Sequence, residues 1–387
     1  MERISRRAVL ASVGISALAG CLGDDQEGTT TGGTTAAIDN EDVEMVTLDN
    51  DFQRVLVGGD PPADEPDDAP PFADRRLSLP MTPESLNREA QDGGPPKDGI
   101  PSVDDPAFVS PSEADFLDDD DVVLAVAGES EQKAYPRSIL VRHEIVNDTL
   151  DGTPVSVTYC PLTGTAQGFE RGDTTLGVSG MLINNNLVMF DREMERWWPQ
   201  IPAVSIPTRW SWVDTDGGAT LREFEVVRTS WGQWRDAHPE TAVMSENTGF
   251  AQDYGRDPYA RRGYYESDQT LFRNTFEHDR YHAKEWVYGT RTEDGEAAFL
   301  KETLQNVGVI HGSAGDRPIV AVYDPTLDTA YVYRNPTEET FEYRDGVVED
   351  EGGTTHRPDE LPLDRIISFD AYWFAWIAYY PNTNVYG

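Results

Sequence analysis

Hydrophobic and polar residues alternate over short stretches along most of the chain, and this pattern predicts β-strands rather than long helices. In the stretch 155–171, Val157 and Tyr159 alternate with serine and threonine, which is the period-two pattern of a half-buried strand. Pro161 and Gly164 then interrupt the pattern and indicate a turn. We therefore predict strand, turn, strand here, with Cys160 at the end of the first strand.

Helical patterns are short and few. Residues 229–248 suggest one short helix, and residues 369–380 have apolar side chains on all sides, which is typical of a buried helix. Residues 176–200 suggest a hairpin that turns at Asn184 and Asn185. The fold class that we predict is α+β and β-rich, with mostly antiparallel sheets, short helices and two pseudo-repeated units in one globular region.

An internal repeat is the basis for the two units. Residues 123–170 align without gaps on residues 287–334, and the two series share matched residues at a constant spacing. The matched pairs include Val123 with Val287, Pro154 with Pro318, Tyr159 with Tyr323, and Pro161 with Pro325. Chance similarity between two β-rich stretches is the alternative. The two series differ where Cys160 faces Asp324 and His143 faces Val307, so the first copy would keep a site and the second a scaffold.

The first twenty residues resemble an export signal. Arg6 and Arg7 form a twin arginine, a short apolar run follows, and the run ends at Cys21. Twin arginine marks the export route for folded proteins, and the residues before Cys21 resemble a lipobox, in which this cysteine receives the lipid. We expect a lipoprotein held at the outer face of the cell membrane by a lipid on Cys21. A plain cleaved signal with an incidental cysteine is the alternative.

Composition divides the remaining chain into three parts. Residues 21–41 are rich in Gly, Thr and Asp and predict a flexible tether. Residues 42–121, rich in Pro and Asp, predict an irregular lead-in, and 122–387 predict the globular domain. No later segment has the length and apolarity of a transmembrane helix.

The charge balance is strongly acidic. The chain has 70 acidic and 31 basic residues, a formal net charge of −39, and only four lysines. Abundant acid with scarce lysine indicates a surface adapted to high salt, where self-repulsion is screened. This charge disfavours a nucleic-acid partner. Once Cys21 is blocked by lipid, Cys160 is the single remaining cysteine, so we expect no structural disulfide.

Several motifs in order resemble an uncharacterised bacterial and archaeal family, the domain of unknown function 3179. The motifs are 143–148 (His-Glu-Ile-Val-Asn-Asp), 159–162 (Tyr-Cys-Pro-Leu), 177–180 (Gly-Val-Ser-Gly), 373–376 (Trp-Phe-Ala-Trp) and 380–383 (Tyr-Pro-Asn-Thr). The resemblance covers roughly residues 100–387. It implies a second cysteine in many members at the position of Thr163, so a dithiol mechanism cannot run within this motif. The family implies no established activity.

One candidate site comprises Cys160 with residues of the preceding motif. Its members are His143, Glu144, Asn147, Asp148, Tyr159 and Cys160. His143 and Asn147 would share a face if that segment is helical. A histidine beside a thiol can lower the thiol pKa and make a catalytic nucleophile, or the pair can bind copper or zinc. A polar cluster that only caps the helix, and a cysteine that is simply buried, are the other interpretations.

A second candidate is the pair His278 and His282. A spacing of four would place both imidazoles on one face of a helix, which is a known metal-ligand arrangement. The zinc-protease pattern is absent because no Glu follows His278. Taken together, we expect a membrane-anchored protein that binds a transition metal or small ligand near Cys160 and His143. A thiol-dependent enzyme and a structural envelope protein are the alternatives.

Overall fold

The computed structural model describes residues 43–48, 52, 54–59, 70–207 and 218–387. Contacts divide the chain after Ala36, and the described residues all belong to the second part, Ala37–Gly387. The expected export signal with Arg6 and Arg7, the lipidated Cys21 and the tether 21–41 lie outside the described residues. The fold is therefore that of the second part.

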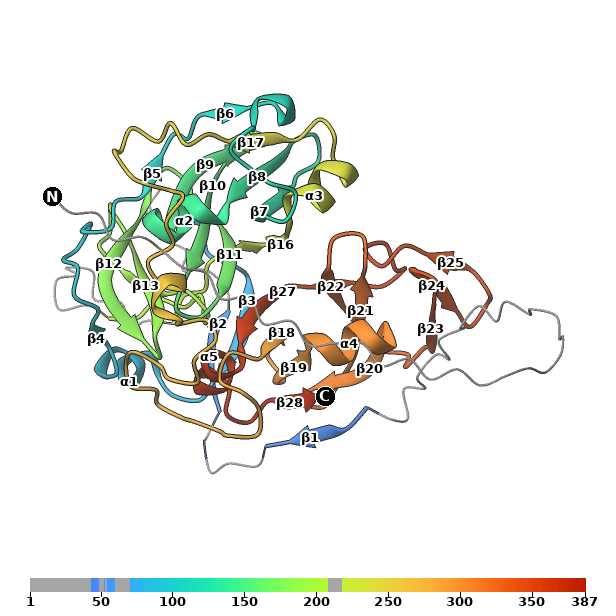
Figure 1. Cartoon of the computed structure of the whole chain (residues 1–387). Helices are drawn as coiled ribbons and strands as arrows, with labels where there is room; N and C mark the ends of the chain where they lie inside the picture. Colours follow the sequence, from blue (N-terminus) through green and yellow to red (C-terminus); the bar gives the residue numbers. More distant parts are fainter. Residues whose placement is uncertain (1–42, 49–51, 53, 60–69, 208–217) are drawn as a thin grey trace, which may run out of the picture. The chain divides into compact units, whose positions relative to one another are not determined.

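Two sets of elements follow one another with the same order and the same lengths (Figure 1). The first set is β7 (Val122–Ala127), β8 (Gln132–Pro136), α2 (Arg137–His143), β9 (Ile145–Leu150), β10 (Thr153–Cys160) and β11 (Thr165–Glu170). The second set is β18 (Trp286–Arg291), β19 (Glu296–Leu300), α4 (Lys301–Val307), β20 (Val309–Ala314), β21 (Arg317–Asp324) and β22 (Thr329–Arg334). Every boundary of the second set lies 164 positions after its counterpart, as 286 follows 122.

Each set contributes to one five-stranded sheet of the same topology. The first has the order β16–β7–β8–β17–β6 and the second β27–β18–β19–β28–β1. In each, the third and fourth strands are parallel and the other neighbours antiparallel. The added strands are β16 (Val227–Ser230), β17 (Ala242–Met244), β6 (Phe108–Val109), β27 (Ser368–Tyr372), β28 (Asn384–Tyr386) and β1 (Met45–Thr47).

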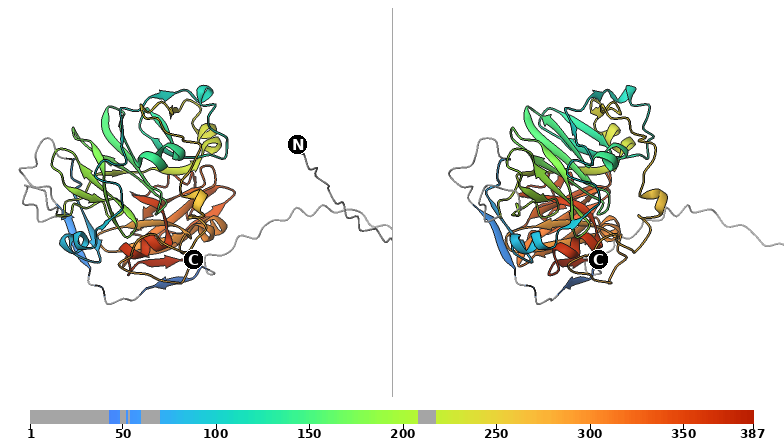
Figure 2. Two further views of the ribbon diagram at one scale, coloured as in Figure 1. Left: turned by 60° about the vertical axis from the view of Figure 1, so that its left-hand side comes forward. Right: turned by 90° about the vertical axis from the view of Figure 1, so that its left-hand side faces the viewer.

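A second sheet accompanies each set. Its orders are β15–β11–β10–β9–β5 and β20–β21–β22–β26, with β15 (Glu223–Phe224), β5 (Val103–Asp104) and β26 (Arg365–Ile366) at the edges. In both views of Figure 2 the green strands of the first set lie together, as do the orange strands of the second.

Two short helices make matching connections between the first and fourth strands of the two five-stranded sheets. Helix α3 (Trp231–Ala237) links β16 to β17, and α5 (Trp373–Tyr379) links β27 to β28. In α3 the indole of Trp234 donates to Thr241 at 2.9 Å, and in α5 the indole of Trp376 donates to Thr383 at 3.1 Å. All seven residues of α5 are buried, as the apolar pattern of 369–380 predicted, but residues 369–372 belong to the strand β27 and not to the helix.

The remaining elements include the strands of three further sheets, one of four strands, one of two and one of three. They are β2 (Val55–Gly59), β3 (Arg75–Leu79), α1 (Pro83–Arg88), β4 (Gln91–Asp92), the 3₁₀ turns Pro111–Glu113 and Ala260–Arg262, β12 (Leu176–Ile183), β13 (Asn186–Asp191), β14 (Trp197–Pro199), β23 (Phe341–Arg344), β24 (Val347–Asp350) and β25 (Thr355–His356). Asn184 and Asn185 form the turn between β12 and β13, both with positive φ, as the hairpin pattern predicted.

The predicted fold class is confirmed at the level of a β-rich protein with mostly antiparallel sheets and few short helices. Two local expectations differ from the structure. Helix α2 ends at His143, and Asn147 lies in β9, so the two side chains do not share a helix face. The lead-in 42–121 supplies several short strands, mostly at sheet edges, such as β1 beside β28. No helix in the described residues has both the length and the apolarity needed to cross a bilayer.

Candidate functional site

Helix α2 ends in a backbone conformation that glutamate rarely adopts. Glu144 follows the helix with φ 60° and ψ −29°, and its N–H donates to the carbonyl of Leu140 at 2.7 Å. Left-handed backbone at this position favours glycine, because a Cβ is crowded there. The corresponding residue after α4 is Gly308, with φ 78°. The carbonyl of Glu144 accepts from Tyr159 at 2.7 Å, which fixes the strained residue against β10.

The side chain of Glu144 is mostly buried. Its exposed fraction is 7%, and within the described part of the chain no group hydrogen-bonds its carboxyl. Burial raises the pKa of this carboxyl from 4.5 to about 8, because a charged carboxylate loses its hydration there. At neutral pH Glu144 is therefore mostly a neutral carboxylic acid that can donate a hydrogen bond.

Cys160 is the last residue of β10 and lies near Glu144. Its exposed fraction is 2%, it pairs with Thr165 across the β10–β11 turn, and its Sγ lies 3.5 Å from the carbonyl oxygen of Asn185. Burial, and next the negative charge available to Glu144, raise the pKa of the thiol from 9 to about 11. At neutral pH the sulfur is therefore a thiol rather than a thiolate.

His143 is held by two other groups. Its Nδ1 lies 2.7 Å from the carbonyl of Pro101 and its Nε2 lies 2.7 Å from the hydroxyl of Tyr254. A carbonyl only accepts, so the ring proton is on Nδ1 and Tyr254 donates to Nε2. Burial lowers the pKa of the imidazole, which keeps it neutral. No hydrogen bond joins His143 to Cys160, and both ring nitrogens are occupied.

The side chains of Asn147 and Asp148 form hydrogen bonds with other residues of the fold. Asn147 donates to Asp104 at 2.6 Å and accepts from Ser156 at 2.6 Å. Asp148 accepts from Tyr135 at 2.7 Å and from a lysine at 2.9 Å. Both side chains are thus satisfied by groups other than Cys160. Of the motif residues predicted to form a site, the structure places Glu144 beside Cys160 and holds the other polar ones elsewhere.

An irregular segment of the described chain, 245–285, supplies two tyrosines that the sequence did not indicate. Tyr264 packs in the same apolar cluster as Cys160, and its hydroxyl donates to the carbonyl of Leu162 at 2.8 Å. Tyr259 packs against Tyr264 with ring centroids 6.0 Å apart. Burial raises the pKa of Tyr259, and charge on Glu144 and Cys160 raises it further. The only signal for this pair was an unusual density of aromatic residues.

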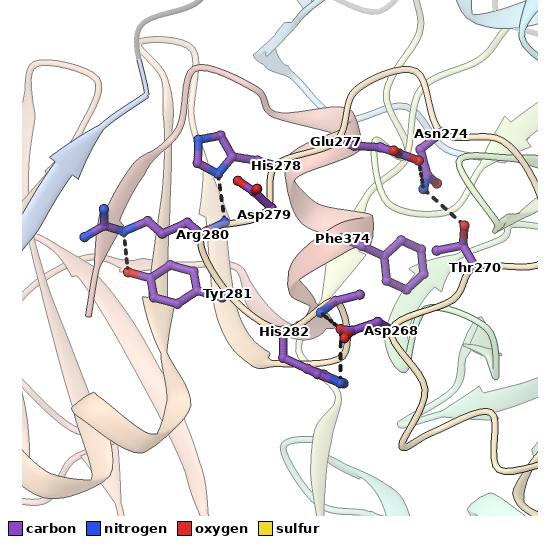
Figure 3. Close-up of a pocket in the computed structure, with 11 residues that line it drawn as sticks. Asp268, Thr270, Asn274, Glu277, His278, Asp279, Arg280, Tyr281, His282 and Phe374 are labelled. Carbon is purple, nitrogen blue, oxygen red and sulfur yellow. Dashed lines mark hydrogen bonds and ion pairs between the residues drawn. The ribbon is translucent and has the colours of Figure 1, made fainter.

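The predicted pair His278 and His282 lies at a separate pocket of about 620 Å³ (Figure 3). The segment is irregular rather than helical. Nδ1 of His278 accepts from the backbone N–H of Arg280 at 3.1 Å, and Nδ1 of His282 accepts from Lys284 at 3.1 Å. Nε2 of His282 lies 3.1 Å from Asp268. Across the described residues, no group of three His, Cys, Asp or Glu side chains could hold a metal ion.

Comparison with known proteins places the chain in a family. The model of the family described as protein of unknown function DUF3179 matches residues 97–383, and the chain belongs to that family. The matched span includes both sets of elements, Glu144 and Cys160. No curated protein and no solved structure matches the chain.

Proposed function

We propose that the protein is an exported lipoprotein, held at the outer face of the cell membrane, whose folded part binds a small ligand. The support for export is the order of Arg6, Arg7, the apolar run and Cys21. Mass spectrometry of the membrane-bound protein tests this part. A lipid mass on Cys21, and release into the medium on Cys21→Ala, are the expected results.

We infer that the folded part arose by duplication of one unit. The support is the constant spacing of 164 between the two sets, their identical sheet orders, and the matching tryptophan–threonine hydrogen bonds of α3 and α5. Independent convergence would have to reproduce each of these features. The second set of elements, β18 to β22, can therefore be compared with the first set, β7 to β11, position by position.

The two sets differ at two matched positions. Glu144 corresponds to Gly308, and Cys160 corresponds to Asp324. The observation that carries the proposed ligand site is Glu144, a mostly buried carboxyl that no described residue hydrogen-bonds, held in a left-handed conformation. Strained backbone destabilises a fold by about 1–3 kcal/mol and concentrates at functional sites, and burial of an ionisable carboxyl adds to that cost. A side chain retained at that cost is best explained by a role in binding.

The ligand class follows from the protonation states. Both Glu144 and Cys160 are neutral near pH 7, because burial raises the pKa of each, and the carboxylic acid donates a hydrogen bond. Their surroundings are apolar and aromatic. Such a site suits a small uncharged molecule with a hydrogen-bond acceptor such as a carbonyl oxygen. The ligand would enter by displacing Tyr259 and Tyr264.

A metal site or a thiol enzyme would require a different protonation state of Cys160 or different hydrogen bonds of His143. A copper or zinc ion would need a thiolate from Cys160 and a ring nitrogen of His143 released from Pro101 or Tyr254. A thiol nucleophile would need the same deprotonation of Cys160. A purely structural role does not explain why the carboxyl of Glu144 is buried. The arrangement therefore favours an uncharged ligand over a metal ion, a thiol enzyme or a structural role.

The experiment is a thermal-shift screen of small uncharged carbonyl compounds in high salt, with elemental analysis of the same preparation. A compound that stabilises the natural protein, slows maleimide labelling of Cys160 and leaves Glu144→Gly unaffected would support the proposal. A compound effect that is equal in both proteins would contradict it. Stoichiometric copper or zinc that disappears in Cys160→Ser would replace it by a metal site.

A further inference from the structure

A cluster of two arginines, Arg291 buried and Arg75 partly exposed, lies apart from the Glu144 site. Arg291 of β18 has an exposed fraction of 3%, and its Nη2 donates to Glu223 of β15 at 2.8 Å. Arg75 of β3 forms an ion pair with the same carboxylate. Two guanidinium groups thus share one carboxylate in the interior, at a place where three segments distant in sequence meet.

Several donors of this cluster have no acceptor. Within the part of the chain that the structure describes, Nε and Nη1 of Arg291, Nε of Arg75 and the hydroxyl of Tyr380 are buried without a hydrogen-bond partner. Tyr380 directly follows α5 and has an exposed fraction of 1%. Burial raises the pKa of Tyr380, and the charges of Arg291 and Arg75 oppose this rise. Buried donors without acceptors are rare and costly, and they commonly mark an ion or ligand.

The charges around the cluster leave it positive. Glu223 balances one of the two guanidinium groups, and the next carboxylate, Glu296, is 3.7 Å from a third arginine, Arg54. Burial raises the pKa of Glu296, and the charges of Arg54 and Arg291 oppose this rise. Burial and the charge of Arg291 lower the pKa of Arg75 to about 9. Among the described residues, the three guanidinium groups thus meet two carboxylates, which leaves an excess of one positive charge.

We propose that Arg75, Arg291 and Tyr380 bind a monovalent inorganic anion such as chloride. One anion would accept hydrogen bonds from the free guanidinium N–H groups and the phenol, and would supply the missing negative charge. The site is independent of Glu144 and Cys160, so its failure would not affect the proposed ligand site. In a protein suited to high salt, the anion would always be available.

The test measures thermal stability of the full chain against chloride concentration, with gluconate replacing chloride at constant sodium. Tyr380→Phe removes one donor to the anion and leaves no other bond broken. The apparent dissociation constant of chloride should rise about tenfold, the loss expected for one hydrogen bond to a charged group. Tyr379→Phe is the matched control, because that hydroxyl donates to the carbonyl of Ile183 at 2.9 Å, and it should leave the chloride dependence unchanged.

Bromide soaking with anomalous diffraction locates the anion directly. A bromide peak within hydrogen-bond distance of Arg291 and Tyr380, together with the shifted chloride dependence, would support the proposal. A water molecule at that position would overturn it. A bromide peak without a difference between the two tyrosine variants would indicate an adventitious ion only, which also overturns it.

Discussion

The stability of this protein should decrease as pH rises from about 4.5 to about 8, and Glu144→Gln should remove part of that decrease. The pKa of the Glu144 carboxyl is about 8 in the folded chain and 4.5 as the ordinary value. The folded state therefore holds a proton that the unfolded state releases between these values. The contribution of this group to stability is fully present below pH 4.5, decreases through the window and stays low above pH 8.

The size of the effect follows from the shift. One pKa unit corresponds to about 1.36 kcal/mol, so between pH 5 and pH 8 this carboxyl alone should lower the free energy of unfolding by about 3 kcal/mol. Glutamine resembles the protonated acid in shape and carries no charge. Glu144→Gln should therefore match the natural protein at pH 5 and exceed it by about 3 kcal/mol at pH 8.

Denaturant unfolding at pH 5, 6, 7 and 8, at one high salt concentration, provides the measurement. Other buried acids contribute too, since burial raises the pKa of Glu225 to about 7. Because those groups are present in both proteins, the difference between natural protein and variant isolates Glu144. A difference that stays constant with pH would refute the argument that this carboxyl is neutral and unpartnered in the folded chain.

Two further results are expected. A chain carrying Cys21→Ser should react with maleimide at Cys160 far more slowly when folded than when unfolded. The reason is that a thiol with pKa about 11 is ionised in only about one molecule in 10⁴ at pH 7. Equal labelling rates in the two states would contradict this. Gly308→Ala should lower the free energy of unfolding by about 2 kcal/mol or more, since its Cβ would lie 2.0 Å from the ring of Tyr343. Gly152 also has a positive φ, of 81°, but nothing lies within 4 Å of a Cβ there, so Gly152→Ala should lower the free energy of unfolding by less in the same assay. Equal losses in the two variants would show that the contact with Tyr343 is unimportant.

The sequence predicted the local elements better than their assembly. The period-two pattern around Val157 and the turn at Gly164 correspond to β10 and β11, because alternation reports directly on a half-buried strand. The repeat alignment stopped at residue 334, although the matching topologies continue through α3 and α5. The intervening segments differ in length, so the constant spacing that made the first part visible does not extend to the second.

The candidate site was only partly predictable. Glu144 and Cys160 are near one another in sequence and joined by adjacent elements, so their proximity followed from the motif. Tyr264 reaches Cys160 from an irregular segment about a hundred positions away, and no local pattern encodes that contact. His143 was expected beside the thiol, but residue spacing does not reveal that Pro101 and a tyrosine occupy its nitrogens.

The most direct test of the proposed site is the free energy of unfolding of Glu144→Gly at pH 7. If Glu144 is retained for binding at the expense of stability, glycine should relieve the strained backbone and remove the buried carboxyl. The variant should be about 3 kcal/mol more stable, because the greater flexibility of glycine in the unfolded chain offsets the relief of strain. Glu338→Gly, at an exposed glutamate with φ 54°, measures the backbone part alone and should change stability by less than about 1 kcal/mol. A loss of stability in Glu144→Gly would contradict the account, because it would show that this glutamate is a structural residue.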